Sequence, residues 1–204
     1  MRPKFSYLCR WLPGRLIDQI EKDLANIIRP LRGAVDDLDE LEVLVILLED
    51  RRFFQHGGID LRSFVREFYK LITLQRFGGA STIDMQFVRT RTGYRDRTFR
   101  RKIYEMLLAW ALQTKMDKIQ ILRAYLSEVY LGTRITGVEC AAQVVFRKAR
   151  YELTREEAAF VASMMVYPRP MRPTESWRIQ VERRAKYGLS LYTKAGQSYR
   201  RQQD

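Results

Sequence analysis

Apolar residues recur at a spacing of three and four positions along most of this chain, which is the pattern of amphipathic helices. Residues 17–28 follow this pattern and predict a helix that ends near Pro30. The apolar run 43–48 follows an acidic start and predicts a buried helix. The same periodicity predicts helices over 59–75, 98–115, 117–131 and 138–146, another before Pro168, and a basic one from about Trp177. Alternation typical of strands is scarce, so the predicted fold class is mainly α.

Capping signals mark two of the helix starts. The small residues 78–82 interrupt the helical pattern and predict a loop, with Ser81 or Thr82 capping the next helix. Thr154 and Glu157 have the spacing of a capping box ahead of the apolar run 158–162. Residues 132–137, bounded by two glycines, predict a turn.

The chain is strongly basic, with a formal net charge of +13. This charge favours an anionic partner, which composition alone leaves open as nucleic acid, an acidic membrane surface or a phosphate-bearing substrate. The 204 residues, 46% of them hydrophobic, suit one domain with a core. His56 is the one histidine, so a multi-histidine metal site is excluded and a metal would rest on carboxylates or on substrate phosphates. Cys9 and Cys140 form no metal motif and give little reason to expect a disulfide.

No stretch of the sequence approaches the roughly 18 apolar residues that a membrane-spanning helix needs. The basic N-terminus is not followed by the apolar core of a signal peptide. We therefore expect neither a membrane span nor a signal peptide in this sequence.

Glu49 and Asp50 stand at the end of the apolar helix predicted over 43–48. Ionised groups avoid apolar surroundings unless they are paired or used in chemistry. A partly desolvated Glu49 would suit a general base near neutral pH. On spacing alone, the favoured interpretation is that both carboxylates pair with Arg51 and Arg52 at the surface.

Two further clusters combine cations with possible anion sites. Residues 79–86, followed by Arg89, place small residues ahead of a helix whose first N–H groups could bind an anion. Lys102 and Glu105 are three apart and face one side of a helix that begins with several cations. Such cations can hold phosphate, Arg as a bidentate fork and Lys as a point charge. Taken singly, these clusters are more typical of a capped helix start and a solvated basic face.

In their order and in their residues, the clusters resemble the motifs of the family 51 glycosyltransferases. This family comprises the transglycosylase domains of bifunctional penicillin-binding proteins and the monofunctional transglycosylases. The resemblance covers roughly 41–175 and rests on five motifs in order. Motif one, E-D-x-x-F-x-x-H-x-G, is met by Glu49, Asp50, Phe53, His56 and Gly58. Motif two, G-x-S-T-I-T-Q-Q, is met in part by Gly79, Ser81, Thr82, Ile83 and Gln86. Motif three, R-K-x-x-E, is met by Arg101, Lys102 and Glu105.

The last two motifs lie further along the chain. Motif four, I-L-x-x-Y-L-N with a later glycine, is met by Ile121, Leu122, Tyr125, Leu126 and Gly132. Motif five, L-T-x-x-E-A-A-x-x-A with following prolines, is met by Leu153, Thr154, Glu157, Ala158, Ala159, Ala162, Pro168 and Pro170. We therefore divide the chain into a basic lead-in over 1–40, the glycosyltransferase domain over 41–175, and a basic C-terminal helix and tail over 176–204.

The resemblance implies a lysozyme-like, mostly helical fold with a membrane-facing jaw over 64–77. It also implies a peptidoglycan glycosyltransferase that polymerises lipid II by inverting transfer and releases undecaprenyl pyrophosphate. Its implied partners are lipid II, the nascent glycan strand, an anionic membrane surface and other cell-wall synthesis proteins, without nucleic acid. The implied location is peripheral to the bacterial cytoplasmic membrane, on a side that the sequence leaves open.

Roles carry over by position within the matched motifs. Glu49 takes the place of the general base that accepts the proton of the acceptor's 4-hydroxyl. Ser81 and Gln86 match donor-site residues. The cations implied to hold the diphosphate are Arg89, Arg97 and Lys102. Glu105 would be the second catalytic carboxylate, orienting these cations or helping to hold a divalent metal, Mg²⁺ or Mn²⁺, and no organic cofactor is expected.

Several positions depart from the family pattern. Asp84 and Met85 replace the usual Thr and Gln of motif two, and Asp84 would add negative charge near the diphosphate site. Gln113 replaces the usual Glu that follows motif three, and Ser127 the usual Asn of motif four. Both proposed catalytic carboxylates are retained.

Three other interpretations compete with the glycosyltransferase. A catalytically silent protein that binds the lipid-linked precursor or other wall-synthesis proteins is favoured by Asp84 and Met85. A hydrolytic relative with the same fold would not need Arg89, Arg97 and Lys102. A nucleic-acid-binding helical protein would explain the charge but not the ordered motifs.

Overall fold

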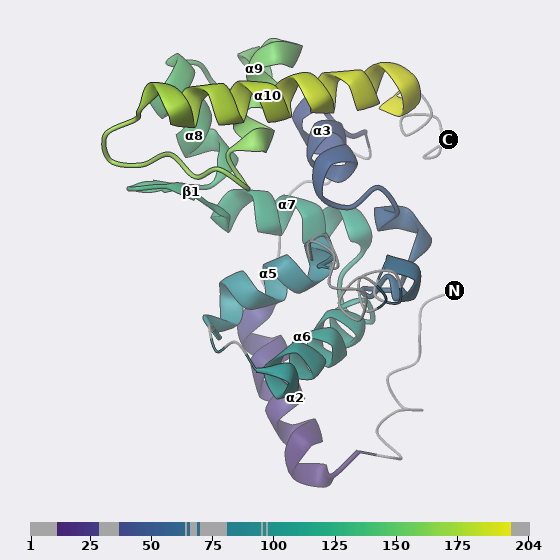
Figure 1. Ribbon diagram of the computed structural model, residues 1–204. Coiled ribbons are helices and arrows are strands. Elements are labelled where there is room, and N and C mark those ends of the chain that lie inside the picture. The colour runs from purple at the N-terminus through teal and green to yellow at the C-terminus, as the bar shows by residue number, and fades with distance from the viewer. Residues whose placement is uncertain are drawn as a thin grey trace. The chain divides into compact units, whose positions relative to one another are not determined.

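The computed structural model describes residues 12–28, 37–63, 65, 69, 81–94, 96 and 98–196. Helices account for most of these residues, which confirms the mainly α fold class (Figure 1). The chain divides into two compact units, a first unit of Met1–Arg32 and Arg52–Leu122 and a second unit of Gly33–Arg51 and Arg123–Asp204. Helix α7, Lys118–Glu128, contributes residues to both units. No helix in the described part of the chain is long and apolar enough to cross a membrane.

Three helices pack together in the first unit. α5, Ile83–Thr92, packs on α6, Phe99–Leu112, and α2, Gly14–Ile27, packs on both (Figure 1). α2 buries Ile20, Leu24 and Ile27 on one face, as its apolar spacing predicts. A 3-10 turn, η1, spans Phe53–Gln55 and buries the ring of Phe53 completely.

The buried face of α6 differs from the one that its apolar pattern suggests. The spacing of Ile103, Met106, Leu107, Trp110 and Ala111 predicts one buried face. Ala111 is buried, but Ile103 is 44% exposed and Met106, Leu107 and Trp110 are half-buried. The helix buries a neighbouring face instead, made by Glu105, Leu108, Ala109, Ala111 and Leu112. The backbone of Gly58 approaches α6 at this face, since a Cβ added there would lie 2.4 Å from the carbonyl oxygen of Ala109.

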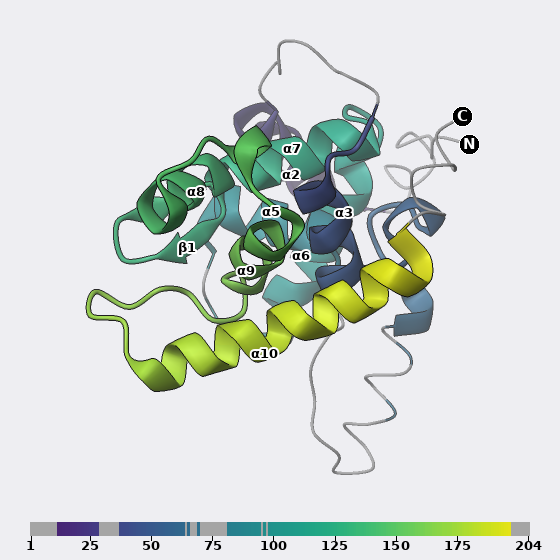
Figure 2. The ribbon, with the colours of Figure 1, turned by 90° about the horizontal axis from the view of Figure 1, so that it is seen from above.

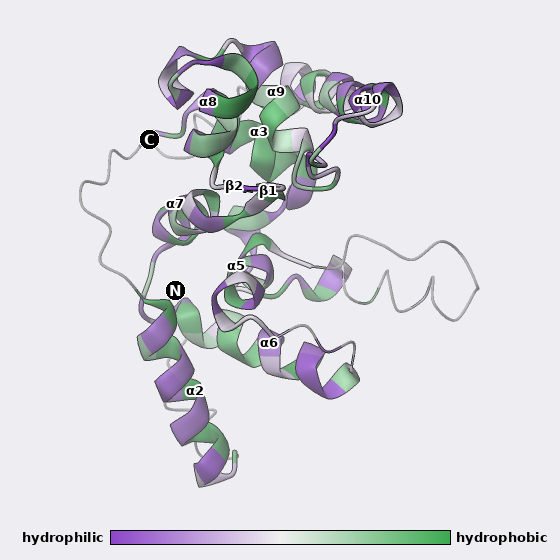
Figure 3. Ribbon diagram, turned by 90° about the vertical axis from the view of Figure 1, so that its left-hand side faces the viewer, coloured by the Kyte–Doolittle hydropathy of each residue, from purple (hydrophilic) through white to green (hydrophobic). Residues whose placement is uncertain are grey.

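The second unit is built around the apolar helix that the sequence predicts before Glu49. This helix, α3, Glu40–Glu49, buries Leu41 to Leu47 without a break. α9, Arg155–Ser163, packs on α3 and on the long α10, Glu175–Leu191 (Figures 1 and 2). Coloured by hydropathy, α3 and α9 are largely apolar, whereas α10 carries many polar residues (Figure 3). α8, Val138–Phe146, the turn η2, Arg150–Glu152, and the π-helical η3, Tyr192–Gly196, complete the unit.

A short hairpin stands where the sequence predicts a turn at 132–137. β1, Tyr130–Gly132, pairs antiparallel with β2, Ile135–Thr136. The strands are too short to change the fold class. Gly132 also bridges to Arg169, whose backbone leaves no room for a side chain at Gly132.

A buried acid fixes the N-terminal end of α3. Asp39 and Glu42 form a capping box, and Glu42 is only 1% exposed. Burial by itself would raise the pKa of Glu42, but hydrogen bonds and charge from Arg123 and Arg150 lower it below its ordinary value. Arg123 and Arg150 thus join α7 and η2 to α3 within the second unit.

Both caps that the sequence predicts are confirmed. Thr82 caps α5 by accepting from Met85 N at 3.2 Å, and Thr154 forms a capping box with Glu157 at α9. The jaw expected over 64–77 falls outside the described residues, apart from Val65 and Tyr69.

Candidate functional site

The start of α5 is tied to the loop that carries motif one. Thr82 Oγ1 donates to the carbonyl oxygen of Gly58 at 2.7 Å. Gly58 has a φ of 90°, a conformation that L side chains rarely adopt, and has no room for a Cβ. Phe53 is buried and His56 is half-buried in the same loop. Ser81, directly before the cap, is therefore held at a defined place.

Lys102 reaches this helix start from α6. Its Nζ donates to Ser81 Oγ at 2.8 Å. Burial lowers the pKa of Lys102; the carboxylate of Glu105 opposes this shift, whereas the cations Arg89 and Arg101 add to it. The structure thus brings together four of the residues predicted from sequence, Ser81, Arg89, Lys102 and Glu105, in a region crowded with positive charge.

Glu105 is almost fully buried beside these cations, with 1% of its surface exposed. Its Oε1 accepts from Arg101 Nη1 at 2.6 Å. Its Oε2 has no hydrogen-bond partner within the described residues. Arg101 was not among the predicted site residues, although its i,i+4 spacing from Glu105 was a signal for this pair.

The unpaired Oε2 of Glu105 is the atom of this cluster that could bind a metal ion. Mg²⁺ and Mn²⁺ prefer oxygen ligands and often combine one carboxylate with substrate phosphates. One buried carboxylate oxygen among several cations fits such a shared site, with the phosphates supplying the remaining ligands. It does not resemble a cage made by protein groups alone.

Gln86 and Arg89 of the predicted donor site both lie on α5. Gln86 is half-buried in the second turn, and Arg89 is exposed one turn later. Arg97, the third cation expected to hold the diphosphate, falls outside the described residues.

Asp84 does not add a bare negative charge beside these groups. Its side chain is completely buried, and one carboxylate oxygen accepts from Lys118 Nζ at 2.8 Å. The other oxygen accepts from the side-chain amide of Gln113. Lys118 Nζ also lies 4.4 Å from the centre of the Phe53 ring and 3.4 Å from His56 Nδ1. Asp84 therefore belongs to a paired buried network, because the charge of Lys118 balances its own.

Glu49 ends α3 in the second unit. Its Oε1 accepts from Arg184 Nη2 at 2.7 Å, and the Glu49 side chain is 11% exposed. Arg184 also donates to the carbonyl oxygen of Leu48 at 3.1 Å, which fixes the guanidinium at the C-terminal end of α3. Sequence reasoning missed Arg184 in this role, because it comes from α10, far along the chain.

The two arginines nearest in sequence to Glu49 have other contacts. Arg51 donates to Tyr187 and to the carbonyl oxygen of Leu47. Arg52 lies 3.7 Å from the carboxylate of Asp60. Glu49 therefore forms an ion pair that joins α3 to α10.

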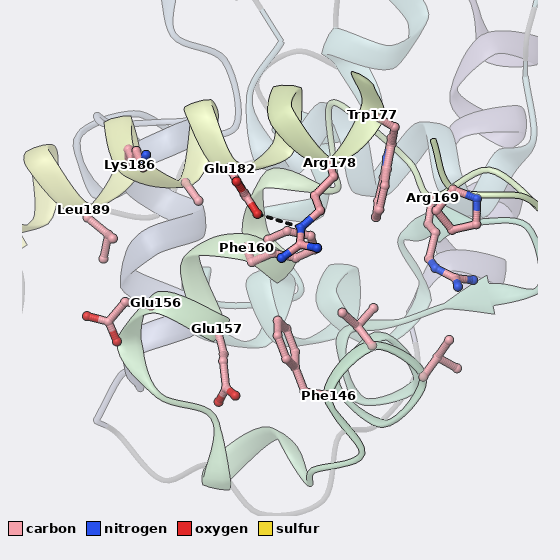
Figure 4. A pocket seen from close by; sticks show the side chains of 14 residues that line it. Phe146, Glu156, Glu157, Phe160, Arg169, Trp177, Arg178, Glu182, Lys186 and Leu189 are labelled. Carbon is pink, nitrogen blue, oxygen red and sulfur yellow. Dashed lines mark hydrogen bonds and ion pairs between the residues drawn. The ribbon is translucent and has the colours of Figure 1, made fainter. Parts of the chain in front are cut away.

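The second unit also has a cavity of about 600 Å³ between α8, α9 and α10 (Figure 4). Phe146, Phe160 and Trp177 line it with edge-to-face ring contacts. At its border, Arg178 pairs with Glu182. The predicted site residues that the structure describes do not line this cavity.

Together, these features are typical of a helical enzyme. Glu105 is a buried carboxylate among cations in the first unit, and Glu49 is an oriented carboxylate at the end of a helix in the second unit. A family model described as transglycosylase matches residues 33–192, and the chain therefore belongs to the transglycosylase family. The lysozyme-like, mainly helical fold expected from the resemblance is the fold of this family. α2 precedes the matched residues.

Relatives in several bacteria agree with this family. A Cupriavidus necator protein whose name describes a transglycosylase is 34% identical over 165 residues, 81% of this chain and 71% of that protein. Penicillin-binding protein 1A of Aquifex aeolicus is 40% identical over 132 residues, and that of Pseudomonas aeruginosa is 34% identical over 168 residues. These matches cover 63% and 78% of this chain, but it spans only 18% and 20% of the length of the two penicillin-binding proteins.

Proposed function

We propose that this chain is a peptidoglycan glycosyltransferase that polymerises lipid II into glycan strands and releases undecaprenyl pyrophosphate. Membership in the transglycosylase family and similarity to proteins named penicillin-binding protein 1A support the glycosyltransferase role. The observation that carries the finer proposal is the cluster in which Lys102 binds Ser81 and stands beside the buried Glu105.

The cations of the first unit would stabilise the leaving group. As the bond between the donor's anomeric carbon and the phosphate oxygen breaks, negative charge grows on the diphosphate. Lys102 and Arg89 can receive that charge, with Ser81 and Gln86 as hydrogen-bonding groups for the donor. Burial and cationic neighbours lower the pKa of Lys102, so a bound diphosphate would favour its charged form.

Glu49 would act on the acceptor sugar. Its carboxylate takes the proton of the 4-hydroxyl while that oxygen bonds to the donor's anomeric carbon, and the diphosphate leaves with the bonding electrons. Attack from the face opposite the leaving group inverts the configuration, by analogy with inverting glycosidases. Arg184 donates to Oε1 of Glu49 and so orients the carboxylate that would accept the proton.

A divalent metal fits the proposal as a second source of positive charge. When bound, Mg²⁺ or Mn²⁺ would neutralise charge on the diphosphate, with Glu105 Oε2 as its protein ligand. Glu105 also holds Arg101 by an ion pair, so it orders the cation cluster whether or not a metal is bound.

The catalytically silent alternative rests on Asp84 and Met85. Because Lys118 pairs with Asp84 inside the first unit, the charge of Asp84 is balanced, which supports the enzyme over the silent protein. Lipid II and the nascent strand are accordingly proposed as substrates. Association with an anionic membrane surface, a peripheral location at the cytoplasmic membrane and contacts with other cell-wall synthesis proteins belong to the same proposal.

The test is polymerisation of labelled lipid-linked disaccharide-pentapeptide in detergent with Mg²⁺ or Mn²⁺. We expect glycan ladders from the wild type and from Glu156→Gln, which alters an exposed carboxylate on α9. We expect none from Glu49→Gln. Ladders of equal intensity from Glu49→Gln would refute the role of Glu49, and a folded wild type that binds the lipid but makes no product would refute the enzyme.

A further inference from the structure

α6 carries an apolar stripe that the core does not use. Phe99 and Ile103 are 71% and 44% exposed, and Leu107 is half-buried. Their spacing of four places all three side chains on one face of the helix. Apolar surface that stays in contact with water at successive turns is typical of a site that another molecule covers.

A groove of about 700 Å³ runs beside this stripe in the first unit. Residues of the first turns of α2, the described residues Tyr94, Asp96 and Thr98, and α6 form its walls. Leu16, Ile103 and Leu107 are its aliphatic lining. Arg15 and Arg100 are exposed cations of the lining, and Asp96 is its acidic residue. The groove therefore combines an aliphatic wall with a positive balance of charge.

Hydrogen bonds to one buried carboxylate hold the groove together. Asp23 of α2 accepts from Tyr104 OH at 2.7 Å and from Tyr94 OH at 3.2 Å. Burial, followed by the hydrogen bond and charge of Asp23, raises the pKa of Tyr104, so this hydroxyl remains a donor throughout the physiological range. α2, which forms one wall of the groove, lies before the residues that match the family model.

We propose that this groove binds a phospholipid of an anionic membrane. Its acyl chain lies against Leu16, Ile103 and Leu107, and its phosphate is held by Arg15 and Arg100. Charge complementarity selects an anionic headgroup, and the aliphatic stripe selects a ligand with a hydrocarbon chain. Phe99, one turn before Ile103, enters the interface beside the bound lipid. This site needs no lipid II, so it stands or falls separately from the proposed activity.

The test is co-sedimentation with two kinds of vesicle. One is phosphatidylcholine alone, and the other contains roughly 30 mol% phosphatidylglycerol, which gives the surface a negative potential. We expect the wild type to bind the anionic vesicles selectively. Each basic residue near such a surface contributes about fivefold in binding, so Arg15→Gln/Arg100→Gln should bind about 30-fold more weakly. Ile103→Asn should lose about fivefold, because the exposed part of an isoleucine side chain no longer gains from burial.

Matched controls remove the same charge and the same apolar surface elsewhere. Arg172→Gln/Arg183→Gln takes two exposed arginines from the second unit, and Ile179→Asn alters an isoleucine of α10 that is 47% exposed. Both controls should bind within about twofold of the wild type, because none of the altered residues lines the groove. Circular dichroism and Tm establish that each variant is folded.

Three results would overturn the proposal. The first is vesicle binding that is unchanged in Arg15→Gln/Arg100→Gln. The second is an equal loss of binding in the control pair, which would mean that net charge alone attracts the protein. The third is full binding by Ile103→Asn, which would mean that no chain enters the groove.

Discussion

Replacing Asp84 with threonine, the residue usual at this position of motif two, removes a carboxylate from a buried ion pair. Asp84 is fully buried, and its partner Lys118 keeps 14% of its side-chain surface exposed. Lys118 Nζ would lose the carboxylate oxygen 2.8 Å away while it remains near the Phe53 ring and His56. The expected result is a loss of stability, even though the new residue is the more typical one for the family.

The size of this loss follows from the burial of the pair. Breaking a buried ion pair by removing one partner costs about 3–5 kcal/mol. Because Lys118 is partly exposed and faces an aromatic ring, the lower end, about 3 kcal/mol, is expected. For a chain of this length that corresponds to a fall in Tm of about 6–12 °C.

A second substitution tests whether the lost charge is the cause. Gln113 and Lys118 bind the two oxygens of the same Asp84 carboxylate, so a carboxylate at position 113 lies close to the Lys118 ammonium. Glutamate is also the usual family residue at this position. Gln113→Glu alone places a second acid against Asp84 and should destabilise the protein. Asp84→Thr/Gln113→Glu should recover most of the stability, with a coupling energy of about 2 kcal/mol.

The assay is urea unfolding followed by circular dichroism for the wild type, both single variants and the double variant. Each curve gives a free energy of unfolding, and the four together give the coupling energy. The reasoning is refuted if the two single effects add to within about 0.5 kcal/mol, or if Asp84→Thr is as stable as the wild type.

Three further predictions concern single residues of the site. Gly58→Ala should lower the free energy of unfolding by about 3 kcal/mol, because the new Cβ would meet Ala109 O and the residue has a φ of 90°. Gly57→Ala is the control in the same unfolding assay. A Cβ there would meet no atom within 4 Å, so stability should change by less than about 0.5 kcal/mol. Because burial lowers the pKa of Lys102, the unfolded chain holds its proton to higher pH than the folded protein does. The free energy of unfolding should therefore rise as pH increases from the pKa of Lys102 in the folded protein towards the ordinary value of 10.5. Unfolding measured at successive alkaline pH values should show this rise for the wild type and not for Lys102→Met. Arg184→Gln should lower kcat about 10- to 100-fold with little change in KM, because Glu49 loses the group that orients it; an unchanged kcat would contradict this role.

Local features of the fold were predictable from sequence. The apolar run before Glu49 and the spacing of Thr154 and Glu157 each depend on residues close together in the chain, and both elements form as predicted. The grouping of Ser81 with Lys102 followed from the order of motifs and not from spacing, because α5 and α6 meet through tertiary packing.

The charge pairs were harder to predict from sequence than the helices and their caps. Nothing near Glu49 in sequence indicates Arg184, and nothing near Asp84 indicates Lys118, since each pair forms only when separate helices pack. Sequence reasoning therefore placed the charge of Asp84 beside the diphosphate, whereas the structure pairs it inside the first unit. The exposed stripe on α6 was missed for a related reason. Periodicity locates apolar residues on a helix but does not decide which of two neighbouring apolar faces the rest of the domain covers.

The central claim, transfer of a sugar from a lipid diphosphate with Glu49 as the base, is tested most directly by the stoichiometry of the reaction. Polyprenyl diphosphate release and glycosidic bond formation would be measured together on labelled lipid-linked disaccharide, for the wild type and Glu49→Gln. The account predicts one diphosphate released per glycosidic bond formed by the wild type, and neither product from Glu49→Gln. Diphosphate released without new glycosidic bonds would mark a hydrolase, and bound lipid with no release from a folded wild type would mark a silent binding protein; either result would contradict the account.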